Sequence, residues 1–520
     1  MEGMRQDRVA GWSAALAGLL TGAAGLGVAL ATSSLLGQRL SPLSAVSETV
    51  IELTPGKIAH LLVSVVGQND KPLLRAGTLV GLLVLAAVAG RVGLRSNLSG
   101  QGVFLAMAVV AGACALGRPG ADPASLLPVV TGLVTWLLVL PVLLDPLRGA
   151  DRDGADEADR PDGAAGADAG RRTFLRRAVL VGLGAAAAGL VGGMFGRKRR
   201  EVERDIASLD LPVTRGTVPA GADLGLEGLA PWRTPNRDFY LIDTTIGVPA
   251  IRKEDWSLRI HGMVDKEIRL SYDDLLAREL TEAWVTLCCV SNEVGGSLVG
   301  NAHWSGVRIA DLLREAGVQD GADAVLQTSE DGWTCGTPVQ ALTDGRDALL
   351  AIAMNGEPLP VEHGFPVRMV VPGLYGFVSA TKWLVDLEVT RFSDVDAFWT
   401  ERGWAEKCPI KTQSRIDVPR ANHRVAAGSV TVAGVAWAQH LGIDKVEVQL
   451  DGKGWQEVEL ARVPSVDTWV QWHGTVDVGP GVHRLTVRAT DRSGETQTSV
   501  RTDVVPDGAS GWDSVEFTAE

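Results

Sequence analysis

Two adjacent cysteines, Cys288 and Cys289, are the residues of this chain best suited to chemistry with a metal. The thiolate form of cysteine binds soft or high-valent metal ions strongly, and the bound metal keeps the sulfur deprotonated. Small residues and Asn292 follow, which suits a metal held close to the backbone. If the segment is extended, the two side chains point to opposite sides. For a cysteine pair considered alone, packing in a core remains the alternative interpretation.

A second group of residues has the chemistry of a phosphate site. His363 and Arg368 are five residues apart, and Pro366 between them prevents a continuous helix. Arginine binds two phosphate oxygens at once, and histidine adds a further donor. Lys382 would add a compact positive charge. Each of these residues alone could equally be a structural polar residue with a satisfied side chain.

These motifs together resemble the sulfite oxidase family of molybdopterin-dependent oxidoreductases. The resemblance extends from about residue 231 to the C-terminus, and its densest part is residues 354–383 (MNGEPLP, HGFPVR, VVPGLYG and ATKWL). It implies an enzyme with a molybdenum–molybdopterin cofactor that transfers an oxygen atom and two electrons. The family pattern of Cys, two small residues and Asn matches Cys289 to Asn292, so the resemblance makes Cys289 the metal ligand.

The resemblance also implies which residues contact the pterin. Asn236, followed by Phe239 and Tyr240, is similar to an early family contact in which an amide meets the donor and acceptor atoms of the pterin. Thr328 is placed only by its spacing from Cys289. The expected cofactor-binding residues are Asn236, Phe239, Tyr240, Asn292, Thr328, His363, Arg368, Ala380, Thr381 and Lys382.

The chain departs from the animal and plant sulfite oxidases where those enzymes carry positive charge. Pro235 stands where they have an arginine, and Glu293 and Val294 stand where they have two. Sulfite is a dianion, so these losses argue against sulfite as the substrate. Arg415 is our candidate for a substitute catalytic charge. The expected substrate is a small oxyanion or a sulfoxide-like molecule.

Five uncharged stretches are long enough to cross a bilayer. Soluble core helices, the alternative, rarely occur as several such runs in succession. Basic residues flank the first stretch and the loop between the second and third, which predicts a cytoplasmic N-terminus in a bacterial cytoplasmic membrane. The stretches are residues 9–38, 76–90, 97–117, 123–144 and 178–196.

Residues 145–177 are predicted to be an acidic, disordered linker that ends in a twin-arginine motif. The linker is rich in Asp, Ala and Gly, and Arg171-Arg172 is followed by Phe-Leu and a mildly apolar run. An ordinary basic flank of a fifth helix is the alternative. A folded, cofactor-loaded domain would then be exported by the twin-arginine machinery and stay anchored, since no A-x-A cleavage site stands out. The basic residues 197–200 would lie outside, against the charge rule.

The exported part is predicted to contain three regions. Residues 201–232 have little periodicity and would form a spacer. Residues 233–415 mix strands and helices and would form the α+β molybdopterin-binding catalytic domain. Residues 416–520 alternate in short strands separated by turns, which predicts an immunoglobulin-like β-sandwich. This last region is similar to the domain through which sulfite oxidases dimerise, so a homodimer is expected.

The composition of the 520-residue chain limits the kinds of binding partner that we expect. The net charge of −13 argues against nucleic acid. Only His60 lies in the membrane half, and C-x-x-C-H is missing, so we expect no haem and a separate electron carrier, either a membrane quinone or a cytochrome. The rival hypotheses are a metal-free, membrane-anchored binding module and a transporter. The near absence of ionisable residues in the spans argues against the transporter.

The export hypothesis predicts the effect of replacing Arg171 and Arg172 together by lysine. The first four spans should still insert, but the catalytic domain should stay in the cytoplasm, because the twin-arginine machinery would no longer accept it. Protease protection on intact spheroplasts measures this directly. A domain that remains digestible from outside in the double variant would show that the arginine pair is an ordinary flank.

Overall fold

The computed structural model describes residues 2–36, 38, 40–54, 70–118, 121–156, 163–194 and 197–520. The chain divides into two compact units. The first, here the helical unit, contains Met1–Glu201 together with Thr244–Ala250. The second, here the sheet unit, contains Val202–Asp243 and Ile251–Glu520. Each unit is described separately below.

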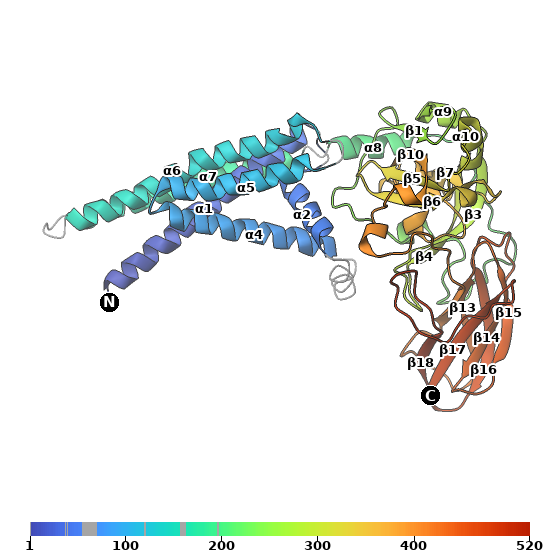
Figure 1. The fold of residues 1–520 in the computed structure, drawn as a ribbon. Helices are drawn as coiled ribbons and strands as arrows, with labels where there is room; N and C mark the ends of the chain where they lie inside the picture. Colours follow the sequence, from blue (N-terminus) through green and yellow to red (C-terminus); the bar gives the residue numbers. More distant parts are fainter. Residues whose placement is uncertain are drawn as a thin grey trace. The chain divides into compact units, whose positions relative to one another are not determined.

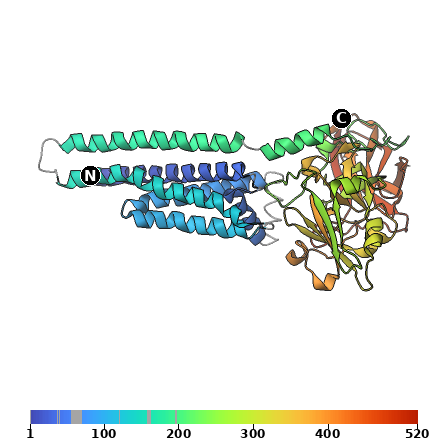
Figure 2. The same ribbon diagram turned by 90° about the horizontal axis from the view of Figure 1, so that it is seen from above.

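The helical unit is built from long apolar helices that lie alongside one another (Figures 1 and 2). Among the described residues, five segments are long and apolar enough to cross a membrane: Gly11–Leu35, Pro72–Gly93, Asn97–Leu116, Pro123–Arg148 and Arg172–Leu190. They agree with the five stretches expected from the sequence. The helices are α1 (Glu2–Leu35), α2 (Pro42–Leu53), α4 (Asp70–Gly93), α5 (Asn97–Leu116), α6 (Leu127–Asp156) and α7 (Gly163–Met194), with a 3-10 turn η2 (Pro123–Leu126) before α6.

Small residues let α1 lie close to its neighbours α4, α6 and α7. A Cβ on Gly18 would lie 2.0 Å from the carbonyl oxygen of Ala86, and a Cβ on Gly90 would lie 2.0 Å from that of Ala14. In lipid the hydrophobic effect does not drive helices together, so apolar helices associate through close backbone contacts of this kind. The indole Nε1 of Trp136 donates to the carbonyl of Gly22 over 3.2 Å and ties α6 to α1.

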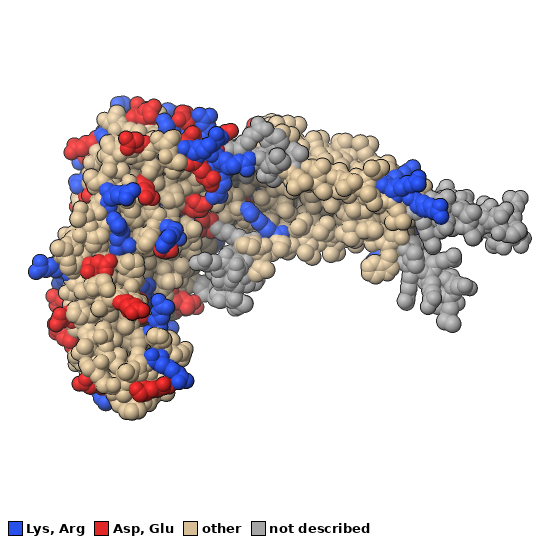
Figure 3. Space-filling view, turned by 180° about the vertical axis from the view of Figure 1, so that it is seen from behind, with Lys and Arg blue, Asp and Glu red and all other residues tan. Residues whose placement is uncertain are grey.

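Basic side chains gather at the end of the helical unit where α4 ends and α5 begins. Arg91 lies 5.6 Å from the ring centroid of Trp12, and Arg148 donates to the carbonyl of Leu94 over 3.2 Å. Arg177 donates to the carbonyl of Val142 over 2.8 Å. The face of this unit seen in Figure 3 is otherwise almost free of charge. A charge-free band with basic residues at one end is typical of helices that span a membrane.

The structure corrects two predictions about the chain around α7. The segment 145–177 is not wholly a disordered linker, because α6 continues to Asp156 and α7 already begins at Gly163. Extending a helix that has already nucleated costs much less than starting one, so these segments can continue the neighbouring helices. Residues 157–162 lie outside the described residues, as does His60. The expected spacer after residue 200 is helical at its start, because α8 spans Arg197–Ser208.

The first part of the sheet unit contains two five-stranded sheets with short helices (Figure 1). One sheet has the order β2-β1-β10-β5-β6, with β1 and β10 parallel. The other has the order β3-β4-β7-β8, and β9 also pairs with β7. Ser271 caps α9 through a capping box, as its sequence predicts.

The strands of this part are β1 (Ser257–Gly262), β2 (Ile268–Ser271), β3 (Thr281–Cys288), β4 (Val299–Arg308), β5 (Ala324–Ser329), β6 (Thr334–Pro338), β7 (Leu349–Met354), β8 (Glu357–Pro358), β9 (Arg368–Val370) and β10 (Leu384–Thr390). The helices are α9 (Tyr272–Leu276), α10 (Ile309–Ala316) and α11 (Val339–Thr343), with 3-10 turns η3 (Asn236–Asp238), η4 (Val361–His363), η5 (Gly376–Val378), η6 (Phe392–Asp394) and η7 (Thr400–Arg402).

The C-terminal part is all-β, as the alternating sequence predicts. Its strand order is β11-β13-β16-β15-β14-β17-β18-β12, and its core packs around side chains such as Trp472, Leu485 and Phe517. The expected boundary at residue 416 is wrong, because β11 begins at Gln413 and pairs with β13. The strands are β11 (Gln413–Val418), β12 (Arg424–Val425), β13 (Gly428–Trp437), β14 (Ile443–Leu450), β15 (Gln456–Leu460), β16 (Val470–Val478), β17 (Gly481–Asp491) and β18 (Asp513–Ala519).

Candidate active site

The cysteine pair lies where β3 turns into β4. The antiparallel register pairs Cys288 with Val299, so the loop between them is short and closed. The amide of Cys289 donates to the carbonyl of Leu298 over 2.9 Å, and the amide of Leu298 donates to Asn292 Oδ1 over 2.8 Å. Asn292 therefore folds the loop through its oxygen. Its buried Nδ2 has no hydrogen-bond partner among the described residues, and it is available to a cofactor.

The two cysteines differ in their surroundings. Cys288 is 1 % exposed, and its thiol donates to the carbonyl of Cys289 over 3.5 Å. Cys289 is 8 % exposed. Burial raises the pKa of the Cys289 thiol, while hydrogen bonds from the amide and hydroxyl of Ser291 oppose that rise. Hydrogen bonds to the sulfur stabilise a thiolate, which is the form that binds metal.

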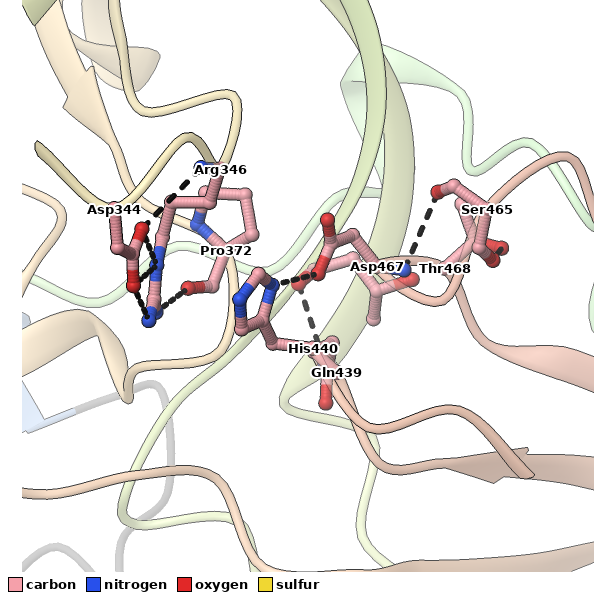
Figure 4. Close-up of polar contacts among 9 residues, drawn as sticks. Asp344, Arg346, Pro372, Gln439, His440, Ser465, Asp467 and Thr468 are labelled. Atoms are coloured by element: carbon pink, nitrogen blue, oxygen red, sulfur yellow. Dashed lines mark hydrogen bonds and ion pairs between the residues drawn. The ribbon is translucent and has the colours of Figure 1, made fainter. Parts of the chain in front are cut away.

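The C-terminal part fixes β3 two residues before the cysteines. The amide of Thr286 donates to the carbonyl of Asp467 over 2.9 Å, and its hydroxyl oxygen accepts from the amide of Trp469 over 2.8 Å. Gln439 donates to the carbonyl of Thr286 over 3.1 Å. His440, the residue after Gln439, lies 3.3 Å from the Asp467 carboxylate (Figure 4). β3 is an edge strand, and the C-terminal part completes the hydrogen bonds of its free edge at this point.

Figure 4 also shows an arginine next to this contact. Arg346 binds the Asp344 carboxylate and donates to the carbonyl of Pro372 over 2.7 Å. Burial raises the pKa of Asp467, while His440 and Arg346 oppose the rise. Charged side chains of both parts thus lie close to the contact that holds β3.

Arg415 reaches the cysteine loop from β11. Its Nη1 donates to the carbonyl of Gly296 over 2.9 Å. Its Nε and Nη2 form a bidentate pair with Asp417, at 2.7 Å and 3.2 Å. Both side chains are 11 % exposed, so the charge of Arg415 is already offset by a carboxylate inside the protein. Through its hydrogen bond to Gly296, Arg415 holds the backbone of the cysteine loop.

A cluster of aromatic rings lies beside the loop. Phe239 and Tyr240 stack with their ring centroids 5.2 Å apart, and Phe239 meets Trp304 and His363 edge-on, each at 5.8 Å. Gly300 is required here, because a Cβ would lie 2.8 Å from the Phe239 ring. Such flat, partly polar walls are typical of sites that bind planar cofactors.

Arg368 is a buried cation next to these rings. It is 5 % exposed, and its guanidinium carbon lies 5.0 Å from the Trp304 centroid. Among the described residues it forms no ion pair with a carboxylate, and it donates only to the carbonyls of His363, Met369 and Ala380. Burial lowers its pKa to about 10, so it is still charged at neutral pH. A bound anion would compensate this charge.

His363 lies on the other side of the same group. Its Nε2 is 2.9 Å from the carbonyl of Asn236. Burial, assisted by the charge of Arg368, lowers the pKa of His363 to about 4. The ring is therefore neutral at pH 7, and its Nε2–H donates to that carbonyl.

Lys382 and its neighbours complete the predicted phosphate end. The Nζ of Lys382 pairs with Asp243 at 2.8 Å and donates to the carbonyl of Glu362 over 3.1 Å. The Thr381 hydroxyl lies 3.2 Å from the sulfur of Cys335, and Ala380 contributes a carbonyl to Arg368. Lys382 thus already has an anionic partner, whereas Arg368 has none among the described residues.

Two predicted residues are not placed as expected. The Asn236 amide is used by the protein itself, because its oxygen accepts from Asn355 over 2.7 Å and its nitrogen donates to the carbonyl of Met354 over 3.2 Å. Thr328 lies on β5 in the other sheet, where it pairs with Asp386 and Thr334. Within the part of the chain that the structure describes, no side-chain hydrogen bond joins Thr328 to the other candidates.

Sequence reasoning missed Tyr375. Burial and the neighbouring Cys288 thiol raise the pKa of this buried tyrosine, which places it close to the cysteines. A Cβ on the next residue, Gly376, would lie 3.7 Å from the carbonyl of Cys288 and 3.8 Å from Tyr240 Oη. The motif VVPGLYG contains both residues and was the available signal.

Known proteins are similar to this chain in sequence and fold. The oxidoreductase molybdopterin binding domain family matches residues 245–399. The uncharacterized oxidoreductase YuiH of Bacillus subtilis is 39 % identical over 149 residues, which cover 29 % of this chain and 72 % of that protein. The chain belongs to the sulfite oxidase family of molybdopterin oxidoreductases. The family resemblance drawn from the sequence is thereby confirmed, and the protein is an oxidoreductase.

More distant sulfite oxidase relatives match a longer region. Mitochondrial sulfite oxidase of Drosophila melanogaster is 30 % identical over 303 residues, which cover 48 % of this chain and 52 % of that protein. The chain thus spans about half the length of this relative. The crystal structure of the sulfane dehydrogenase SoxCD from Paracoccus pantotrophus superposes with a TM-score of 0.50 at 24 % identity, covering 58 % of this chain and 88 % of that chain. That likeness shows the fold.

The arrangement of the buried pair Arg415 and Asp417 predicts a loss of stability. Replacing Asp417 with Asn should destabilise the sheet unit by about 3 kcal/mol, because it leaves a buried arginine unpaired. Arg415→Met combined with Asp417→Leu should recover most of that loss, because both charges are then removed. Denaturant titration of the full chain, followed by the tryptophan fluorescence of the sheet unit, measures both. A single variant as stable as the parent would contradict the prediction.

Proposed function

We propose that this protein is a membrane-anchored molybdopterin oxidoreductase that acts on a small sulfoxide-like molecule or oxyanion. One observation carries the proposal. Burial raises the pKa of the Tyr240 hydroxyl, the thiols of Cys289 and Cys288 raise it further, and the guanidinium of Arg368 lowers it, so both groups act on one hydroxyl. A thiol suited to a metal and an unpaired buried cation suited to a phosphate therefore lie within reach of one side chain.

The donor set fits a molybdenum–molybdopterin cofactor. Among the described residues no group of three or more His, Cys, Asp and Glu side chains could hold a metal ion. A metal bound by Cys289 would thus take its other ligands from a cofactor. Arg368 would neutralise a phosphate of that cofactor, and the Asn292 amide nitrogen would donate to it. The cofactor, when bound, supplies the oxygen-atom transfer and the two-electron chemistry.

The other residues of the site would hold and shield the cofactor. Phe239, Tyr240 and Trp304 form an aromatic wall, and neutral His363 keeps the chain at Asn236 in place. Arg415 holds the loop that carries Cys289, so we now assign it a positioning role in place of a catalytic charge. The amide of Asn236 and the hydroxyl of Thr328 contact the cofactor only if their present partners give way.

The helical unit supports a location in a bacterial cytoplasmic membrane. The positive-inside rule places the basic end, with Arg91, Arg148 and Arg177, on the cytoplasmic side. Five crossings would then leave the sheet unit outside, which requires export of a folded domain after Arg171-Arg172. Electrons would pass to or from a separate membrane quinone or cytochrome, with no haem in this chain. The C-terminal β part, as an immunoglobulin-like domain, would support a homodimer.

The first prediction separates the two cysteines. Cys289→Ser should abolish turnover, because serine oxygen is a harder ligand and shifts the potential of the metal. Cys288→Ser should keep most of the activity, since among the described residues the hydrogen bond of its thiol goes to the carbonyl of Cys289. Turnover per molybdenum, measured with one reductant in both variants, tests this. An equal loss in the two variants would refute the choice of ligand, and purified protein without molybdenum would favour a metal-free binding module.

The second prediction concerns the substrate. Sulfite should be oxidised poorly, because Pro235 and Glu293 replace cationic positions of sulfite oxidases and Arg415 is paired with Asp417. Losing one charge about 4 Å from an anion forfeits roughly 4 kcal/mol at an effective dielectric near 20, and even a third of that is about tenfold in affinity. Steady-state kinetics with sulfite and a sulfoxide panel measure the difference. Rapid turnover that saturates at micromolar sulfite would contradict it.

A further inference from the structure

The short segment Thr244–Ala250 joins the helical unit by its contacts, although the chain on both sides of it belongs to the sheet unit. It has no helix or strand. Thr245 and Ile246 are only 4 % and 6 % exposed. A buried irregular segment must find partners for its peptide groups, so its hydrogen bonds show what holds it.

Those partners come from a single carboxylate on α2. Glu48 Oε1 accepts from the amide of Ile246 over 3.0 Å, from the amide of Gly247 over 3.3 Å, and from the hydroxyl of Thr245 over 3.3 Å. Arg75, at the start of α4, donates to the carbonyl of Ile246. One acidic and one basic side chain of the helices thus bind the two faces of one peptide segment.

The charge of Glu48 is balanced within the helices. Its Oε2 lies 3.7 Å from Nη1 of Arg118, and both side chains are 8 % exposed. Arg118 also donates to the carbonyl of Cys114 over 3.3 Å and to the hydroxyl of Thr49. Ionisable groups buried among apolar helices are costly, so such a group usually has a specific task. Here its oxygen points at the amides of a segment that is more than 190 residues away in sequence.

The segment leads directly into the candidate cofactor site. Asp243, the residue before it, forms the 2.8 Å ion pair with Lys382, and Tyr240 lies three residues further back in the aromatic wall. Rigid fixation of Thr244–Ala250 would restrict the positions of both. A free segment would let Asp243 leave Lys382.

We propose that Glu48 is a positioning residue, a latch that binds Thr244–Ala250 to the helices and thereby fixes Asp243 and Tyr240 at the cofactor site. The helical unit then contributes to cofactor retention in addition to anchoring the chain. The part of the proposal that concerns the cofactor rests on the proposed function, whereas the latch itself does not.

Hydrogen exchange tests the latch in the full chain reconstituted in lipid nanodiscs. In Glu48→Ala the amides of Ile246 and Gly247 should exchange about tenfold faster or more, because a charge-assisted acceptor is lost. Glu48→Gln keeps an acceptor oxygen and should restore most of the protection. Gln101→Ala, which removes a contact from α5 to the carbonyl of Leu137 elsewhere in the helical unit, is the matched control and should leave both amides protected.

Molybdenum and pterin content after gel filtration tests the second step. Glu48→Ala should retain several-fold less cofactor than the parent and Gln101→Ala, and Glu48→Gln should recover it. Unchanged exchange at Ile246 and Gly247 in Glu48→Ala would overturn the latch. Faster exchange with full cofactor retention would overturn the positioning role. If the parent itself contains no molybdopterin, the proposed function and the positioning role fail together, while the exchange result still decides the latch.

Discussion

The uncompensated guanidinium of Arg368 is the constraint around which the site is organised. A buried charge without a counter-charge is costly, and here the surrounding protein supplies only carbonyl dipoles and an aromatic face. The same burial and charge keep His363 neutral, so that it acts as a donor to the Asn236 carbonyl. Lys382, by contrast, has its own carboxylate. Among the described residues, Arg368 is therefore a buried cation without a carboxylate partner.

The cysteine loop depends on support from distant parts of the chain. The C-terminal part binds the peptide of Thr286 through two hydrogen bonds and its hydroxyl through a third, and Arg415 holds the carbonyl of Gly296 on the other side of the loop. The β-rich part is thus a structural component of the site. A loop fixed at both ends can hold a metal ligand in one orientation, which oxygen-atom transfer at a metal requires.

Residue types suited to the proposed chemistry were easier to predict from the sequence than the contacts between residues. Cys289, His363 and Arg368 could be proposed as site residues because their residue types and spacing are local, and the apolar spans could be predicted because their composition is extreme. The spacing of Arg415 and Asp417 on one strand suggests that their side chains can pair. The burial of this pair, which makes the loss of one partner costly, depends on packing that the sequence does not show. The role of Asn355, which occupies the Asn236 amide, depends on the fold and has no local signal.

Helix boundaries were less predictable for a related reason. The acidic linker has a composition typical of disorder, yet α6 and α7 extend into it, because extending an existing helix costs far less than starting one. Asp243 is another example. Nothing in its neighbours along the chain marks it, and its partner Lys382 lies 139 residues away.

The extension of α7 has a consequence for biogenesis. Arg171 and Arg172 lie within the helix that begins at Gly163. If the pair is an export signal, as we propose, folding of α7 and recognition of the pair compete for the same residues. A receptor that binds the pair as an extended peptide has to act before this helix forms, or melt its first turns. Because a helix forms within about a microsecond, far faster than the chain is synthesised, such a receptor would meet a folded α7 and would have to melt its first turns.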